Sequence, residues 1–211
     1  GCTEVEVRPV SGQMANMVVF SALPDYLNRD NRRAEPRRIR SVLNNHILRG
    51  GHLSAQPMGA LRDFVARDPA TEAPAVISLP VLAEDPYRPD VSRLPEVLER
   101  TRPELVILGK SMILYREPVA DVRRLVDEMG LGTLVMYDMA HVLGLVGRHF
   151  QDPFRGGADG VTGSSHNTFF VTQRGLYYPW PEPHAAWSAI GRALLAGVLL
   201  AFAWRFYARR L

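Results

Sequence analysis

The sequence of 211 residues contains almost no cysteine and almost no lysine. Its one cysteine, Cys2, excludes an internal disulfide and favours a reducing compartment, so we expect a cytoplasmic protein. Its one lysine, Lys110, leaves arginine to carry nearly all of the positive charge, and a net charge of +3 is too small for a polycation. The chain opens at Gly1, without an initiator methionine or the basic and apolar regions of a signal peptide. We therefore expect a fragment.

The pattern of apolar residues predicts one α/β domain. With 46% hydrophobic and 22% charged residues, the chain can bury a sizeable core. Apolar runs bounded by Gly or Pro predict strands at 75–79, 104–109, 133–137 and 158–162, after an extended, edge-like entry at 5–10. Helical spacing predicts helices at 14–23, 58–66, 96–102 and 118–129, and a hairpin is expected about Gly175, between 169–174 and 176–180. A strand, a helix and a strand in this order form a right-handed βαβ unit, so the predicted architecture is three-layer αβα with a mostly parallel sheet.

Polar side chains gather where the predicted strands end. Asp138 and His141 follow the strand at 133–137, and Lys110 with Ser111 follows the strand at 104–109. Two further sets are His52, which follows two glycines, and the stretch 164–166. Asp138 and His141 alone could be a capping carboxylate and a core histidine. Because the carboxyl ends of parallel strands meet at one edge, the convergence of four such sets favours a binding crevice.

Other kinds of site are less well supported by the sequence. Asp138, His141 and a third histidine could hold a metal, but no second ligand pair has metal-like spacing. A hydrolase triad lacks its nucleophile elbow. The arginines of 28–40 could bind nucleic acid, but no aromatic residues interleave with them and a solvated face is the commoner outcome. The apolar stretch 185–204 could span a membrane, although its uninterrupted part, 193–204, is short, which favours an amphipathic or core helix.

An aromatic cofactor fits the strand ends better. A carboxylate at Asp138 would keep a pyridine nitrogen protonated, which makes the ring an electron sink. His52 could stack on the ring. The helix start at Ser11, Gly12 and Gln13 could hold a phosphate, although such a sequence is more often only a helix cap.

Four stretches carry a resemblance to a known family: S-G-Q-M-A-N at 11–16, G-G-H-L at 50–53, V-M-Y-D-M-A-H-V-L-G-L-V at 135–146 and G-S-S-H-N-T at 163–168. In order and spacing, over about residues 1–175, the chain resembles serine hydroxymethyltransferase, a fold-type I enzyme that uses pyridoxal 5′-phosphate. The stretches N-N-H-I-L-R-G-G-H-L-S-A-Q-P-M and T-F-F-V-T-Q-R-G look closer to the threonine transaldolase and α-methylserine hydroxymethyltransferase branch. The resemblance implies residues 1–180 as a partial cofactor-binding large domain, and 181–211 as an unmatched helical tail.

The resemblance also implies roles for individual residues. The phosphate would be bound by Ser11, Gly12 and Gln13, and His52 would stack on the ring. Asp138 would pair with the ring nitrogen, and Ser111 and His141 would contact the substituent side. Ser164 and His166 would flank the internal aldimine. The family reaction makes or breaks the Cα–Cβ bond of a β-hydroxy amino acid through a glycine quinonoid, with glycine, serine or threonine as substrate, in a homodimer, with tetrahydrofolate as a possible cosubstrate.

Position 167 departs from the family pattern at the residue that would attach the cofactor. Where the family has the Schiff-base lysine, this sequence has Asn167, and an amide can form no Schiff base. Lys110 could replace it, but a solvated lysine or one behind the site is the favoured interpretation. The sequence also lacks the family's N-terminal arm and its C-terminal small domain, as a truncated or frame-shifted gene would. We therefore expect an impaired enzyme; the alternatives are a pseudoenzyme that holds the cofactor or pairs with an intact paralogue, and a membrane-tethered domain.

Overall fold

Six short strands form one sheet in the described residues of the computed structural model, which are 5–30, 37–145, 150–167 and 175–179. The strand order is β2-β1-β3-β4-β5-β6. Neighbours from β2 to β5 run parallel, and only β6 is antiparallel to its neighbour β5. The strands are β1 Val42–Asn44, β2 Val76–Ser78, β3 Leu105–Leu108, β4 Leu134–Asp138, β5 Gly160–Ser164 and β6 Gly175–Pro179. The prediction of a mostly parallel sheet is confirmed.

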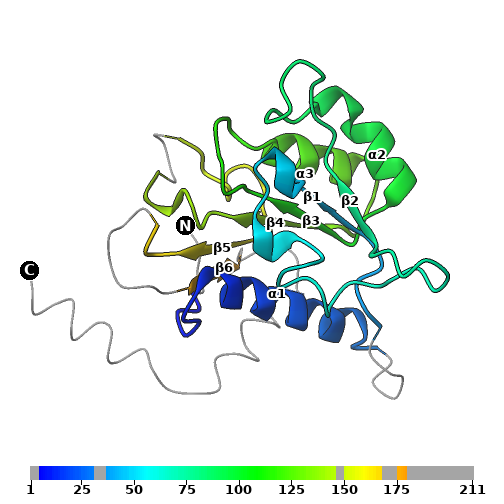
Figure 1. Ribbon diagram of the computed structural model, residues 1–211, viewed down its shortest axis with the longest axis horizontal. Coiled ribbons are helices and arrows are strands. Elements are labelled where there is room, and N and C mark those ends of the chain that lie inside the picture. The colour runs from blue at the N-terminus through cyan, green and yellow to red at the C-terminus, as the bar shows by residue number, and fades with distance from the viewer. Residues whose placement is uncertain (1–4, 31–36, 146–149, 168–174, 180–211) are drawn as a thin grey trace, which may run out of the picture.

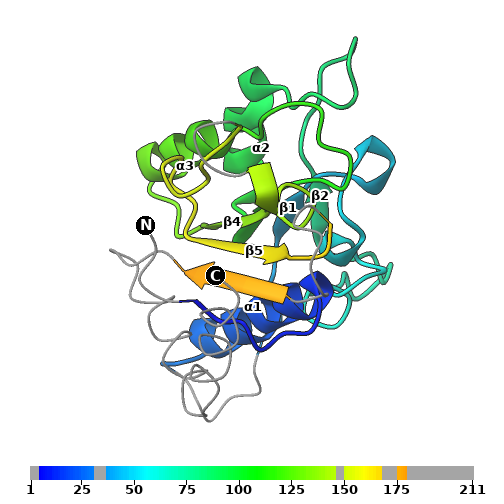
Figure 2. The ribbon, with the colours of Figure 1, turned by 90° about the vertical axis from the view of Figure 1, so that its left-hand side faces the viewer.

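Helices cover both faces of this sheet. Helix α1, Gly12–Leu27, lies on one face, and α2, Leu94–Thr101, lies with α3, Val119–Glu128, on the other (Figure 1). The view turned by 90° shows the same three layers (Figure 2). The three-layer αβα architecture is therefore confirmed.

The central strands are buried on both faces, which explains their unbroken apolar sequences. In β3, Val106 and Leu108 belong to the core beneath α2 and α3, whereas the alternate residues Leu105 and Ile107 belong to the core beneath α1. Strand β4 divides its side chains between the two cores in the same way. These two strands bring their carboxyl ends to the same edge of the sheet.

Several predicted helices occur with small shifts in their ends. Helix α1 extends the predicted 14–23 to Leu27, because Asn28 closes its last turn by donating its backbone and side-chain N–H groups to the Pro24 carbonyl. Helix α3 matches its prediction closely, and Gly130 follows it with a positive φ of 59°. Helix α2 begins two residues earlier than predicted.

The predicted helix at 58–66 is wrong. The chain forms successive turns there, with hydrogen bonds from Gly59 N to Gln56 O and from Arg62 N to Gly59 O. A Cβ on Gly59 would lie 2.1 Å from Leu53 O, so the backbone passes too close to the preceding segment for a regular helix. The entry at 5–10 forms no regular strand, and Glu6 is its one residue in a β-bridge.

One feature of the sheet differs from the sequence prediction. Strand β1 was not predicted, yet it lies between β2 and β3. Strand β6, which was predicted, pairs with β5, and the other arm of the predicted hairpin, 169–174, lies outside the described residues. Residues 168–174, the domain boundary near 180 and the tail 181–211 lie outside the described residues. Among the helices that are described, none has the length and apolar character needed to cross a membrane.

Candidate functional site

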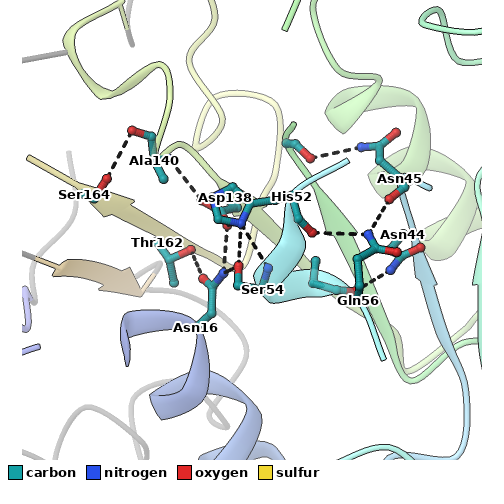
Figure 3. Close-up of polar contacts among 12 residues, drawn as sticks. Asn16, Asn44, Asn45, His52, Ser54, Gln56, Asp138, Ala140, Thr162 and Ser164 are labelled. Atoms are coloured by element: carbon teal, nitrogen blue, oxygen red, sulfur yellow. Dashed lines mark hydrogen bonds and ion pairs between the residues drawn. The ribbon is translucent and has the colours of Figure 1, made fainter. Parts of the chain in front are cut away.

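The carboxyl ends of four parallel strands place the predicted site residues at one edge of the sheet. The segment after β1 carries His52, the segment after β3 carries Ser111, and β4 ends at Asp138. The segment after β5 carries His166 and Asn167. Helix α1 contacts β5 and the short 3-10 helix η2, Leu53–Ala55 (Figure 3). These contacts bring the N-terminus of α1 to the same edge of the sheet.

Asp138 is a buried carboxylate with two hydrogen-bond donors. Only 2% of the residue is exposed. Asn16 Nδ2 donates to its Oδ2 at 2.8 Å, and the backbone N–H of Ala140 donates to its Oδ1 at 3.0 Å. A carboxylate offers about four acceptor positions, so Asp138 retains capacity for a further donor. This arrangement can bind an N–H group of a ligand while that ligand is shielded from water.

Two half-buried histidines stand beside this carboxylate. The ring centroids of His52 and His141 are 5.1 Å apart, with an angle of 56° between the ring planes. The pKa of His141 is lowered, first because burial desolvates its charged ring and then because repulsion from His52 and His166 disfavours its charged form, while attraction to Asp138 partly offsets this lowering. Around neutral pH, His141 is therefore a neutral hydrogen-bonding group.

The N-terminus of α1 packs against the end of β5. Ser11 caps the helix, its Oγ accepting from Met14 N at 3.1 Å. A Cβ on Gly12 would lie 3.2 Å from the Cβ of Ser164 and 3.6 Å from that of Ala140, so glycine keeps this approach open. The first amides of a helix have no partner within the helix and suit an anion. The adjacent Gln13 is exposed.

Position 167 also lies at this edge. Asn167 Nδ2 donates to Ala140 O and to Ser164 Oγ, both at 3.1 Å. Ser164 Oγ in turn donates to Ala140 O at 3.3 Å. The exposed His166 precedes it and is close enough to influence the pKa of His141. The side chain at 167 therefore contacts the segment that follows Asp138.

The lysine next to Ser111 faces a different set of groups. Ser111 is half-buried, and its backbone N–H donates to Gly50 O at 2.9 Å. The Lys110 side chain is 3% exposed, lies 3.5 Å from Glu117 Oε1 and donates to Tyr87 O at 2.5 Å. Of the two interpretations of Lys110, burial excludes the solvated lysine and leaves the lysine behind the site. The ion pair with Glu117 and the hydrogen bond to Tyr87 hold this ammonium, and neither partner is among the groups that contact Asp138.

Three neutral polar residues of the site were not singled out from the sequence: Asn16, Ser54 and Thr162. Asn16 contacts Asp138, Ser54 and Thr162 directly (Figure 3). The available signal was weak, because Asn16 is a single amide on the otherwise apolar buried face of α1. For the metal alternative, the described part of the chain contains no group of three or more His, Cys, Asp or Glu side chains suited to an ion.

Comparison with known proteins points to one family. The family model described as serine hydroxymethyltransferase matches residues 1–178. The serine hydroxymethyltransferase of Archaeoglobus fulgidus is 38% identical over 173 residues, which is 81% of this chain and 34% of the relative. The enzymes of that name from Pyrobaculum calidifontis and Thermoplasma volcanium are 37% and 33% identical, over 83% and 93% of this chain and 36% and 41% of their own lengths. The chain thus matches little more than a third of each relative.

Proposed function

This chain belongs to the serine hydroxymethyltransferase family, and from that premise we propose that its described site binds pyridoxal 5′-phosphate. The observation that carries the proposal is the meeting of a buried carboxylate, a histidine ring and a helix N-terminus at one edge of a parallel sheet. These three groups suit a ring nitrogen, a ring face and a phosphate. We further infer that residues 1–180 form the cofactor-binding domain.

The phosphate would lie at the start of α1. Ser11, Gly12 and Gln13 offer the first-turn amides of a 16-residue helix, whose dipole favours an anion. Acidic residues, which would repel a phosphate, are absent from that first turn. Gly12 supports this assignment, because a larger residue would fill the space toward Ser164.

The ring would lie between Asp138 and His52. Asp138 would accept a hydrogen bond from the protonated ring nitrogen, using the acceptor capacity that Asn16 and Ala140 leave open. His52 would cover one face of the ring. Ser111 and His141 would contact its substituent side, and Ser164 and His166 would flank its carbonyl end. When bound, the cofactor supplies an electron sink for the charge that develops at Cα as a bond to Cα breaks.

Asn167 limits what this site can catalyse. A side-chain amide is neither a nucleophile toward an aldehyde nor a proton acceptor at neutral pH, so the cofactor would be held without covalent attachment. Lys110 is unsuited to replace the lysine, because leaving Glu117 would strand a buried carboxylate. We propose that this chain is catalytically impaired. A non-catalytic protein that binds the cofactor, alone or with a paralogue, is the second candidate, and Asn167 is the observation that favours it.

The wider activity is also a proposal, since the chain matches only 34–41% of these relatives' lengths. We propose a small amino acid, glycine, serine or threonine, as the substrate class, and cleavage or formation of the Cα–Cβ bond as the reaction. The transaldolase and α-methylserine branch, use of tetrahydrofolate, a homodimer and a cytoplasmic location belong to the same proposal. With the cofactor saturating, an impaired enzyme releases glycine slowly from serine or threonine, whereas a pseudoenzyme releases none.

The test compares the wild-type chain with Asn167→Lys. Each protein is saturated with pyridoxal phosphate, treated with borohydride and mapped by peptide mass spectrometry. We expect reversible cofactor binding without specific labelling in the wild type, and a stable label at position 167 in the variant. Arg100→Lys is the matched control, because Arg100 is exposed on α2 and its side chain contacts only Glu96 among the described pairs.

Two outcomes would overturn the assignment. A wild-type label at Lys110 would mean that the chain uses its own lysine. Labelling of Asn167→Lys at no higher level than Arg100→Lys would mean that position 167 does not face the cofactor aldehyde.

A further inference from the structure

Asn16 joins three segments of the site through its side-chain amide, whose nitrogen and oxygen both have hydrogen-bond partners. It is 0% exposed. Nδ2 donates to Asp138 Oδ2 at 2.8 Å and to Ser54 Oγ at 2.5 Å, while Oδ1 accepts from Thr162 Oγ1 at 2.5 Å (Figure 3). The orientation of the amide follows from these partners. Reversed, it would set its oxygen against the Asp138 carboxylate, which can only accept.

The direction of donation continues from Asn16 to His52. Because Ser54 Oγ accepts from Asn16, its own hydrogen remains available for His52 Nδ1, 2.6 Å away. The backbone N–H of Ser54 also donates to His52 Nδ1, at 3.2 Å. A backbone N–H can only donate, so Nδ1 is an acceptor and the single ring proton lies on Nε2.

This proton arrangement decides the relation between His52 and Asp138. His52 Nδ1 and Asp138 Oδ2 are 3.7 Å apart, within the range of an ion pair. With Nδ1 unprotonated, the two atoms are both acceptors and no ion pair forms. The Asn16 amide donates a hydrogen bond to Asp138 and another to Ser54, whose hydroxyl can donate to His52 Nδ1. Asp138 and His52 therefore each have a hydrogen-bond partner other than one another.

We propose that Asn16 is a positioning residue that keeps His52 as the neutral Nε2–H tautomer, through Ser54, and keeps Asp138 available to a ligand. Without Asn16, a protonated Nδ1 of His52 would donate to the Asp138 carboxylate and take up the acceptor position that a ligand would use. The role of this arrangement rests on the function proposed above. A ring whose nitrogen is kept protonated by a hydrogen bond to Asp138 is cationic, and a neutral imidazole can cover it without like-charge repulsion. Asn16 thus fixes the hydrogen-bond roles of both groups that would contact the ring.

The prediction is tested on the protein without cofactor. NMR spectra of the histidine ring nitrogens distinguish a protonated from an unprotonated nitrogen, and His52→Gln identifies the signals of His52. In the wild type at pH 7.5 we expect His52 with Nδ1 unprotonated and Nε2 protonated. In Asn16→Ala the ratio of tautomers should move toward Nδ1–H by about fivefold, which corresponds to one net hydrogen bond.

Two further variants separate positioning from simple stability. Asn28→Ala, the matched control, removes an amide that caps the other end of α1, so it should weaken the helix and leave His52 unchanged. Ser54→Ala breaks the connection between Asn16 and His52 but leaves Asn16 on Asp138, so it should shift the His52 tautomer in the same direction. This variant also supports the test if Asn16→Ala does not fold.

The contrary results are specific. A wild-type His52 that is protonated at Nδ1, or a folded Asn16→Ala whose His52 nitrogens match those of the wild type, would overturn the inference. Failure of the wild type to bind pyridoxal phosphate would instead overturn the proposed function and leave the tautomer result intact. The two ideas therefore fail separately.

Discussion

The buried ion pair of Lys110 and Glu117 gives the clearest prediction about stability. The two side chains are 3% and 1% exposed, with Nζ and Oε1 3.5 Å apart. The other carboxylate oxygen of Glu117 accepts from Asn45 Nδ2 at 2.5 Å and from Gly109 N at 3.1 Å. This carboxylate therefore holds together the segments that follow β1 and β3.

Glu117→Gln removes the charge and preserves the shape. The buried Lys110 ammonium then loses the counter-charge of Glu117, and the new amide must turn an N–H group toward one of the donors that Glu117 accepted. Breaking a buried pair from one side costs about 3–5 kcal/mol. Because domains are stable by only about 5–15 kcal/mol, we expect a partly or largely unfolded variant at moderate urea concentrations.

Urea unfolding followed by circular dichroism measures this loss. Glu128→Gln is the matched control, since Glu128 and Arg124 form an exposed pair at 3.0 Å, and such pairs contribute about 0.3–0.5 kcal/mol. Adding Lys110→Met to Glu117→Gln should restore part of the stability by removing the stranded charge. A Glu117→Gln loss within about 1 kcal/mol of the control value would refute the reasoning.

Two further predictions concern the edge of the sheet. Gly109→Ala should lower stability by at least about 1–3 kcal/mol, because Gly109 has a φ of 100° and a Cβ there would lie 2.1 Å from Asp138 O. In the same urea assay the control Gly132→Ala should be tolerated, because a Cβ on Gly132 meets nothing within 4 Å. His141→Gln should reduce the loss of stability on acidification: the folded pKa of His141 lies below its ordinary value of 6.5, so the unfolded chain binds more protons as the pH falls through that range. An unchanged difference in unfolding free energy between pH 7.5 and 5.5 would contradict this account of His141.

The sequence predicted the parts of the fold whose physical signal is local. Strands β3 and β4 are apolar without interruption because both faces are buried, and α3 shows helical spacing with a glycine at its end. Strand β1 has only three residues and ends at Asn44, whose buried amide donates to Ala55 O, a contact 11 residues away that no local pattern indicates. The turns at 57–64 depend on a close approach to Leu53, which is equally invisible in a periodic pattern.

The site divides in the same way. Asp138, His52 and His141 could be predicted because charged and imidazole groups at strand ends are costly to bury without a partner. Asn16 and Thr162 could not, since a single neutral polar residue in a helix or strand has no distinctive spacing. The two residues belong to the site because Thr162 donates a hydrogen bond to Asn16, although 146 positions separate them in the sequence.

The central claim is that Asp138 holds the ring of pyridoxal phosphate, and calorimetric titration of that cofactor into the purified chain tests it most directly. We predict saturable binding at one site, weakened about 10- to 100-fold in Asp138→Asn, because a hydrogen bond to a charged group is worth about 1.5–3 kcal/mol. Asp30→Asn, which alters a carboxylate that is 89% exposed, should bind as the wild type does. Equal affinity in Asp138→Asn, or no saturable binding in the wild type, would contradict the account.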